Sequence, residues 1–113
     1  MQGKFVPFDE LTIIAELRKL PVEDRAKLYR AMSRYADLRL GDEPFPAVVK
    51  DYGKGIWMIR HASHEAQGRL LFCKKRMQND TKFVILVVYK KETQSVPARI
   101  LRTAIDRKKL GEK

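Results

Sequence analysis

Three short apolar runs between Ile56 and Lys91 constrain the fold of this chain more than any other feature. They read IWMIR, RLLFC and FVILVVYKK, and the polar segments HASHEAQG and KKRMQNDTK separate them. Short runs rich in β-branched and aromatic residues, bounded by segments of turn composition, are typical of strands. The pattern therefore predicts a three-stranded meander. Residues 83–89 are apolar throughout, so we expect them to form its central strand, covered on both faces.

The first twenty residues predict a short strand followed by a helix. Residues 4–6 can form an edge strand that Pro7 ends, because proline lacks the N–H that a ladder needs. Asp9 suits the N-cap of a helix running to about Leu20, and Pro21 stops that helix. The apolar side of this helix is expected to consist of Leu11, Ile14, Leu17 and Leu20.

A second helix is expected to begin at Pro21 and to end at Gly41, which can take the left-handed cap. Its charged residues recur at spacings of three and four and are Glu23, Lys27, Arg30, Arg34 and Asp37. The opposite side should be an apolar stripe of Val22, Ala26, Tyr29, Met32 and Ala36. Two helices joined this tightly form a hairpin, which must cover one side of the sheet to bury both stripes.

The segment GDEPFPAVVK is a connector from helices into strands. Val48 and Val49 are expected to pair at the sheet edge, before residues 53–55 turn the chain into Ile56. After the meander, Pro97 marks a last helix with an apolar face of Ile100, Leu101, Ala104 and Ile105. These elements predict one α+β domain over residues 1–113, in which an N-terminal helical hairpin packs on a small, mainly antiparallel sheet of three to four strands and a basic helix follows.

The positive charge of the chain lies entirely in its second half. Residues 1–46 hold 8 Lys and Arg against 8 Asp and Glu, whereas residues 47–113 hold 16 against 6 and carry the whole formal net charge of +10. Such a field attracts polyanions, most obviously nucleic acid. Solubility alone is the alternative reading, but a random scatter of charge would not leave the first half neutral.

Cysteine and hydropathy patterns favour a soluble protein of the cytoplasm. Cys73 is the only cysteine, so no intrachain disulfide is possible, and its place in an apolar run predicts a small core residue rather than a nucleophile. No apolar run approaches the ~20 residues of a membrane span, and the N-terminus lacks the apolar stretch of a signal peptide. We therefore expect no membrane association.

The sequence contains no phosphate-binding glycine loop, no Cys/His zinc pattern and no nucleophile elbow. His61 and His64 occur in HASHE, which matches neither helical zinc motif, so both are expected to be exposed loop residues within reach of a phosphate. Carboxylates in the basic half are too scarce for a two-magnesium site. We expect no metal and no cofactor, and any nuclease chemistry would have to proceed without a metal.

Cations gather at the ends of the predicted strands. Arg60 closes the first run, Arg69 opens the second, and Lys90 and Lys91 close the third. At strand ends, loss of such charges should cost little packing. The last helix adds five cations in eleven residues, which are Arg99, Arg102, Arg107, Lys108 and Lys109. So many cations favour a rim that faces RNA or a partner over a surface that is only solvated.

Several of these motifs occur together in a known family. Residues 55–60 read GIWMIR, Arg69 opens the next strand, and residues 90–97 read KKETQSVP before a basic helix with Ala104. In this order, over about residues 11–110, they resemble the phage-derived branch of the RelE/HigB-like toxins. The resemblance implies a RelE-like fold and the toxin of a type II toxin–antitoxin pair, an endoribonuclease that cuts mRNA on the ribosome and so inhibits translation. Its partner would be a cognate antitoxin, expected to be a helix-turn-helix protein.

The resemblance also implies where the chemistry lies. Arg60 and Arg69 would hold the phosphate, and a lysine, Lys90 or Lys91, or a histidine would move the protons. Trp57 and Tyr89 are expected to be core residues rather than stacking platforms. Further RNA contacts are expected from Lys74, Lys75, Arg76, His61, His64, Arg102, Lys108 and Lys109. Two other classes stay open, a non-catalytic RNA- or DNA-binding module and a basic protein that binds an acidic partner.

The cysteine and ligand census generates a first prediction. Any ribonuclease activity of the chain should be unchanged by EDTA and by dithiothreitol, because neither a metal site nor a disulfide is expected. Cleavage of an RNA substrate before and after exhaustive dialysis against chelator measures this. Loss of activity that zinc or magnesium restores would contradict the expectation.

Overall fold

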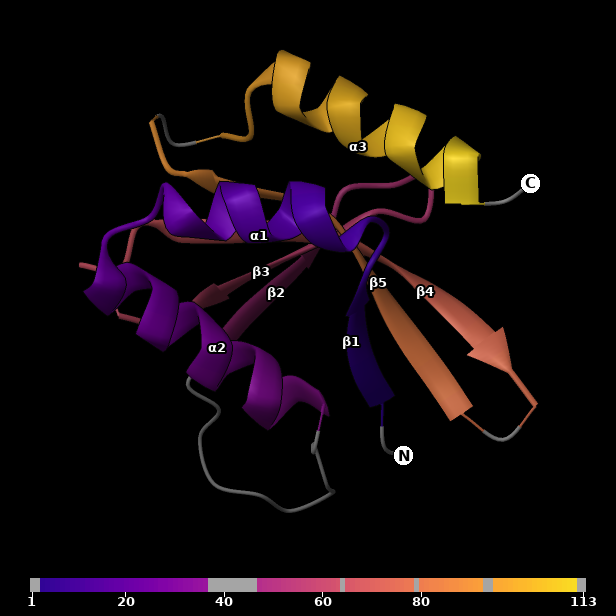
Figure 1. Cartoon of the computed structure of the whole chain (residues 1–113), viewed down its shortest axis with the longest axis horizontal. Coiled ribbons are helices and arrows are strands. Elements are labelled where there is room, and N and C mark those ends of the chain that lie inside the picture. The colour runs from indigo at the N-terminus through magenta and orange to yellow at the C-terminus, as the bar shows by residue number, and fades with distance from the viewer. Residues whose placement is uncertain (1–2, 37–46, 64, 79, 93–94, 112–113) are drawn as a thin grey trace.

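The computed structural model describes residues 3–36, 47–63, 65–78, 80–92 and 95–111. Within these ranges five strands form one mixed sheet between two helical layers, so the α+β class is confirmed (Figure 1). The elements are β1 (Gly3–Pro7), α1 (Glu10–Arg18), α2 (Val22–Ala36), β2 (Ala47–Asp51), β3 (Trp57–His61), β4 (Gly68–Met77), β5 (Asp80–Lys90) and α3 (Ala98–Gly111). No helix in the described ranges is both long and apolar enough to span a bilayer.

The predicted meander is present as β3, β4 and β5, each antiparallel to the next. The strand order is β1-β5-β4-β3-β2, which corrects the prediction that β5 would be central, because β4 occupies the middle position. The expected sheet of three to four strands has a fifth because β1 pairs with β5 in parallel. Coverage of β5 on both faces is confirmed, since residues 85–88 are all buried.

Both edge strands occur where the sequence placed them. β1 ends at Pro7, and β2 pairs with β3 through Val48 and Val49. The β2–β3 turn uses backbone with positive φ at Gly53 (79°) and Gly55 (74°), a region that glycine enters at little cost. The connector over residues 37–46, including the predicted helix end at Gly41 and the side chain of Asp37, lies outside the described residues.

The helical hairpin is confirmed, and its first cap is the predicted one. The Asp9 carboxylate accepts hydrogen bonds from the Thr12 backbone N–H at 3.0 Å and from the Thr12 hydroxyl at 2.6 Å. The apolar side of α1 was predicted partly wrongly, because Leu11 is 81% exposed and Ile13 is buried in its place. Residues 13, 17 and 20 face the sheet, a spacing that places them on one side of the helix.

The predicted apolar stripe of α2 was also wrong in part. Val22 is 72% exposed, and Ala26 and Tyr29 are exposed as well. The buried face is instead formed by Leu28, Ala31 and Met32. Two stripes at helical spacing overlap at Met32, and the sheet selects the one whose larger members, Leu28 and Tyr35, pack into the core around Phe72.

Two hydrophobic cores lie on opposite faces of the sheet. Under α1 and α2, four aromatic rings pack with centroids 4.9 to 6.3 Å apart, in the tilted or edge-to-face arrangements that aromatic pairs prefer, and they belong to Phe5, Tyr35, Phe72 and Phe83. Under α3, Met58, Leu71 and Leu86 pack against Ala104 and its neighbours. The predicted apolar face of α3 is therefore confirmed, and Cys73 borders this core as a half-buried residue.

Part of the β5 edge has no partner strand, and a bulge in β5 begins at the same place. Leu71 pairs with Val87 and Phe72 with Ile85, so Leu86 is the extra residue. β1 separates from β5 at the same point, where the Phe8 N–H donates to the Ile85 carbonyl at 2.9 Å. Beyond that contact, the polar backbone groups on this edge of β5 need other partners.

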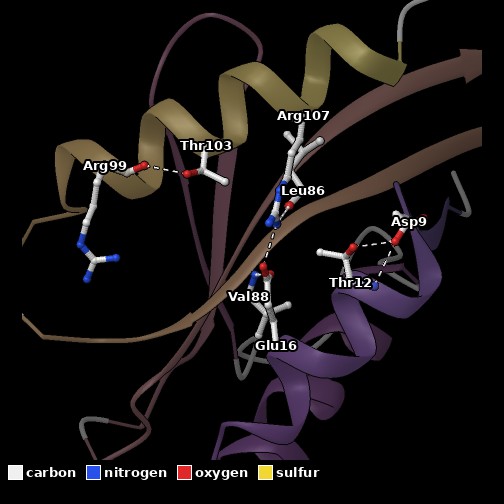
Figure 2. A network of polar contacts seen from close by, with 8 residues as sticks. All are labelled: Asp9, Thr12, Glu16, Leu86, Val88, Arg99, Thr103 and Arg107. Atoms are coloured by element: carbon white, nitrogen blue, oxygen red, sulfur yellow. Dashed lines mark hydrogen bonds and ion pairs between the residues drawn. The ribbon is translucent and has the colours of Figure 1, made fainter.

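Glu16 and Arg107 supply those partners (Figure 2). One Glu16 carboxylate oxygen accepts from the Val88 N–H at 2.9 Å, and the other accepts from Arg107 Nη1 at 2.8 Å. Arg107 Nη1 also donates to the Leu86 carbonyl at 2.8 Å, and its guanidinium lies 4.9 Å from the centre of the Phe8 ring. We call this the Glu16–Arg107 clasp. Arg107 was expected on a basic rim, but its side chain is 20% exposed and binds α1 and β5 instead.

The clasp predicts strong energetic coupling between α1 and α3. Removing Arg107 alone leaves one oxygen of the Glu16 carboxylate and the Leu86 carbonyl without their donor in a half-buried place, so R107A should cost about 2–4 kcal/mol of unfolding free energy. E16A and R107A should be non-additive by more than about 1 kcal/mol in a double-mutant cycle from denaturant unfolding. R102A, which removes an exposed cation of the same helix, is the control and should change stability little. Additive effects of E16A and R107A would contradict the clasp.

Candidate functional site

Two arginines from neighbouring strands share one face of the sheet with two tyrosines. Along β3, Arg60 follows Met58 by two residues, and along β4, Arg69 precedes Leu71 by two. Side chains two residues apart point to the same face, so both arginines lie on the face that α3 partly covers. Tyr89 is the direct partner of Arg69 on β5 and lies on this face too, as does Tyr52 after β2. We call Arg60 and Arg69 the arginine pair.

Arg69 is held firmly by its surroundings. Only 7% of the residue is exposed, and its Nη1 donates to the carbonyls of Ala66 at 2.8 Å and Gly68 at 3.1 Å. Burial lowers the pKa of Arg69, and the positive charge of Arg60 lowers it further, whereas the Tyr89, Asp24 and Tyr52 side chains act in the opposite direction. The expectation that a strand-end cation is removable at little packing cost is therefore wrong for Arg69.

Arg60 is half-buried and less constrained. Its Nη1 donates to the His61 carbonyl at 3.0 Å, which fixes one side of the guanidinium. Within the described ranges, neither Arg60 nor Arg69 forms an ion pair with a carboxylate. Asp24 offsets the positive charge only in part, because desolvation and Arg60 outweigh it at Arg69, so the two adjacent cations are electrostatically complementary to an anion such as a phosphate.

Tyr89 adds a neutral hydroxyl to the arginine pair. Burial raises the pKa of Tyr89 to about 12, the neighbouring Tyr52 adds to the rise, and Arg69 opposes it. The phenol is therefore protonated at neutral pH and can donate a hydrogen bond but cannot serve as a phenolate base. Sequence reasoning expected Tyr89 only in the core and did not consider Tyr52. In the sequence, only the position of Tyr89 directly before Lys90 could have pointed to a role at the site. The pairing of Tyr89 with Arg69 is seen only in the structure.

His61 lies away from the arginine pair. It alternates with Arg60 along β3 and so faces α2, where burial first and then Lys27 and Arg30 lower its pKa. The ring is thus mainly neutral at pH 7, and its Nδ1 accepts from the Ser63 N–H at 3.1 Å, which leaves the proton on Nε2. Because its accepting nitrogen is occupied and its ring faces α2, His61 is poorly placed to take a proton from a substrate bound at the arginine pair. His64 lies outside the described residues.

The two predicted lysines close the end of β5 near the arginine pair. Lys90 pairs with Gly68, the residue before Arg69, but its side chain alternates with Tyr89 and is exposed. The Lys91 N–H donates to the Gln67 carbonyl at 2.7 Å and ties this end of β5 to the loop before β4. Tyr89 and Lys90 also line a groove of about 420 Å³ that runs between α1 and the first turns of α3 and includes Lys19 and Arg99.

The remaining predicted RNA contacts do not gather with the arginine pair. Lys74, Lys75 and Arg76 belong to the outer part of the β4–β5 hairpin. Lys75 follows Arg69 by six residues on one strand, which places the two about 20 Å apart. Lys74 Nζ lies 3.9 Å from the centre of the Trp57 ring, on the face opposite Lys75. On α3, Lys108 and Lys109 lie in the last turn, and Arg102 is exposed beside Asp106 at 3.9 Å.

No group of three His, Cys, Asp or Glu side chains in the described ranges is arranged to hold a metal ion. Metal independence itself stays a prediction, because only an activity measurement tests it.

A family model for the phage-derived protein Gp49-like family (DUF891) matches residues 15–109, which is most of the chain. The chain belongs to this family. The match includes both members of the arginine pair, Tyr89 and all but the ends of the fold. No curated protein matches the chain. The resemblance stated from the sequence is thereby confirmed at the level of a phage-derived, Gp49-like protein, whereas the specific RelE/HigB assignment stays a prediction.

The different environments of the two arginines generate a stability prediction. R69A should lower the free energy of unfolding by about 1–3 kcal/mol, because it removes a buried side chain and the donor to two carbonyls. R60A should have a smaller effect, because Arg60 is half-buried and makes one such bond. Urea unfolding of both variants measures the difference. Equal stability of R69A and wild type would show that the Arg69 contacts do not contribute to folding.

Proposed function

We propose that this chain is the toxin of a type II toxin–antitoxin pair and that it cleaves mRNA in the bacterial cytoplasm without a metal ion. The observation that carries the proposal is the arginine pair, two adjacent cations on one face of the sheet with no carboxylate partner among the described residues. Membership in the Gp49-like family supports a toxin-like role. The net charge of +10, carried by residues 47–113, favours a nucleic-acid substrate.

The proposed chemistry uses the RNA itself as the nucleophile. The 2′-hydroxyl attacks the adjacent phosphorus, the bond to the 5′-oxygen breaks, and the products carry a 2′,3′-cyclic phosphate and a 5′-hydroxyl. Charge accumulates on the non-bridging oxygens as the pentacoordinate phosphate forms. Arg60 and Arg69 stabilise that charge, and they do so effectively because Arg69 is already desolvated and fixed before the substrate arrives.

Proton transfer is assigned by elimination and position. Tyr89 stays protonated and is placed beside Arg69, so it gives its proton to the leaving 5′-oxygen as the P–O bond breaks, and the phenolate then takes a proton back from water. His61 faces α2 and has its Nδ1 occupied, so it is the weakest candidate. Lys91, two residues after Tyr89, is the stronger candidate for taking the 2′-hydroxyl proton, because the Lys90 side chain alternates with that of Tyr89 and so points away from the arginine pair.

A non-catalytic RNA-binding module is the second candidate function. The uneven charge distribution favours it as much as it favours the enzyme, because binding alone needs only cations. A cognate antitoxin and association with the ribosome belong to the first proposal. A binding module would retain RNA affinity and produce no cleaved ends.

The proposal predicts that induced expression arrests bacterial growth and produces mRNA fragments with 5′-hydroxyl ends. Replacing Arg60 with alanine should reduce the cleavage rate by about 10²–10³-fold, since one group that stabilises transition-state charge is lost. R69K keeps the positive charge but loses the planar guanidinium, whose Nη1 binds the Ala66 and Gly68 carbonyls, so it tests geometry with less damage to the fold. Primer extension on polysomal mRNA, with a thermal melt of each variant, measures both effects.

R18A is the matched control, because it removes one exposed arginine from the end of α1, and Arg18 is not among the residues predicted to contact RNA. It should keep full toxicity and full cleavage. If R60A and R69K fold normally and cleave at the wild-type rate, the arginine pair is not the catalytic site. If wild type leaves mRNA intact both free and on ribosomes, the enzyme proposal fails and the binding module replaces it.

A further inference from the structure

Three lysines from three neighbouring strands stand in one row across the sheet. Lys4 of β1 pairs with Lys82 of β5, and Lys82 pairs with Lys75 of β4. All three point to the α3 side, because Val6, Val84 and Cys73, which lie two residues away on the same strands, line a groove beside α3. Adjacent strands lie about 4.8 Å apart, so the row spans about 10 Å. We call Lys4, Lys82 and Lys75 the lysine row.

Lys75 and Lys82 of the lysine row line a groove of about 590 Å³ between β1, the β4–β5 hairpin and the end of α3. Phe8, Val84 and Leu86 contribute apolar surface to its lining, and the α3 side contributes Arg107 and Lys108. Figure 1 shows the end of α3 above the strands from which this groove is built. Among the described residues that line it, none carries a carboxylate.

The charges of the row are not compensated within the described residues. None of Lys4, Lys75 and Lys82 forms an ion pair there, although Asp80 lies two residues before Lys82 on the same side of β5. Like charges directly opposite one another on paired strands destabilise a sheet. A row of three such cations therefore works against folding unless an anion is bound across it.

We propose that the lysine row binds the phosphate backbone of single-stranded RNA as a second contact, about 20 Å from the arginine pair. This inference deepens the proposed function, from which it takes the identity of the polyanion. Lysine ammonium groups are point charges that hold phosphates without reading bases, so the contact should be independent of sequence. An acidic protein segment is the less favoured occupant, because charged residues, lysine among them, are depleted from the centres of protein–protein interfaces.

The test is a binding titration with a 16-nucleotide RNA in which every 2′-hydroxyl is methylated, so that no cleavage by the proposed route is possible. Dissociation constants are measured by fluorescence anisotropy between about 50 and 300 mM salt for wild type and K75A/K82A. Each lost phosphate contact lowers the slope of log affinity against log salt by about 0.7, so the double variant should lose about 1.4. Its dissociation constant at the lowest salt should rise at least about tenfold.

K27A/R30A is the matched control. Like K75A/K82A it removes two positive charges, but it removes them from α2, on the opposite face of the sheet. We expect its salt slope to equal that of wild type. An unchanged slope in K75A/K82A, or an equal loss in both double variants, would overturn the lysine row as an RNA contact. In that event, weaker binding of a co-expressed acidic partner to K75A/K82A alone would assign the groove to a protein.

A stability measurement separates binding from folding. K75A/K82A should melt at the same temperature as wild type or higher, because it removes a repulsive cross-strand pair. Lower stability together with weaker binding would point to structural damage and would contradict the proposal. Because the methylated RNA reports binding only, loss of the slope in K75A/K82A upholds the lysine row even if R60A shows that no cleavage occurs at the arginine pair.

Discussion

The bidentate use of one carboxylate, Glu16, determines how the three layers of this fold stay together. β1 pairs with β5 only as far as Ile85, because β1 ends at Pro7, and the next residue of β5, Leu86, is the extra residue of the β4–β5 bulge. The exposed edge needs a donor and an acceptor at that point, and Glu16 from α1 and Arg107 from α3 provide them. The clasp therefore takes the place of missing strand pairing. It ties α1 to the Val88 N–H and α3 to the Leu86 carbonyl of β5.

The position of α3 in turn defines what the other face of the sheet can do. α3 covers Met58, Leu71 and Val87 but leaves the ends of β3 and β4 beyond them, where Arg60 and Arg69 lie. Burial of Arg69 beside Arg60 is unfavourable for the free protein, because desolvation and like charge both work against the charged form. Its two carbonyl contacts and the neighbouring tyrosines offset part of this cost. Proteins keep such arrangements where charge is needed for binding or catalysis rather than for stability.

Like charges are also placed next to one another, at a cost in stability, at the opposite end of the sheet. The lysine row and the arginine pair are separate concentrations of positive charge at the two ends of β4 and β5, and a core with four aromatic rings in tilted or edge-to-face contact lies on the opposite face of the sheet. α1 and α2 of the neutral N-terminal half pack on the buried residues of β3, β4 and β5 to form that core, while the cationic half also carries both groups of positive charge. The uneven charge along the chain therefore corresponds to an uneven placement of charge in space. Of the N-terminal elements, only β1 contributes a cation to the lysine row.

Local chemistry determined much of this protein. Period-two runs gave the meander, Asp9 and Pro21 set the bounds of α1, and Pro97 marked α3, because caps, proline and strand alternation act over a few residues. The same alternation placed Arg60 and Arg69 at strand ends. Only the tertiary structure decided which of two overlapping stripes on α2 is buried, that β4 rather than β5 is central, and that Arg107 belongs to a clasp. It also decided that Lys4 stands beside Lys82 and Lys75, and that Arg69 is buried against Tyr89. These features depend on strand order, register and the bulge at Leu86, which arise from contacts between residues far apart in the chain and leave no periodic trace in the sequence.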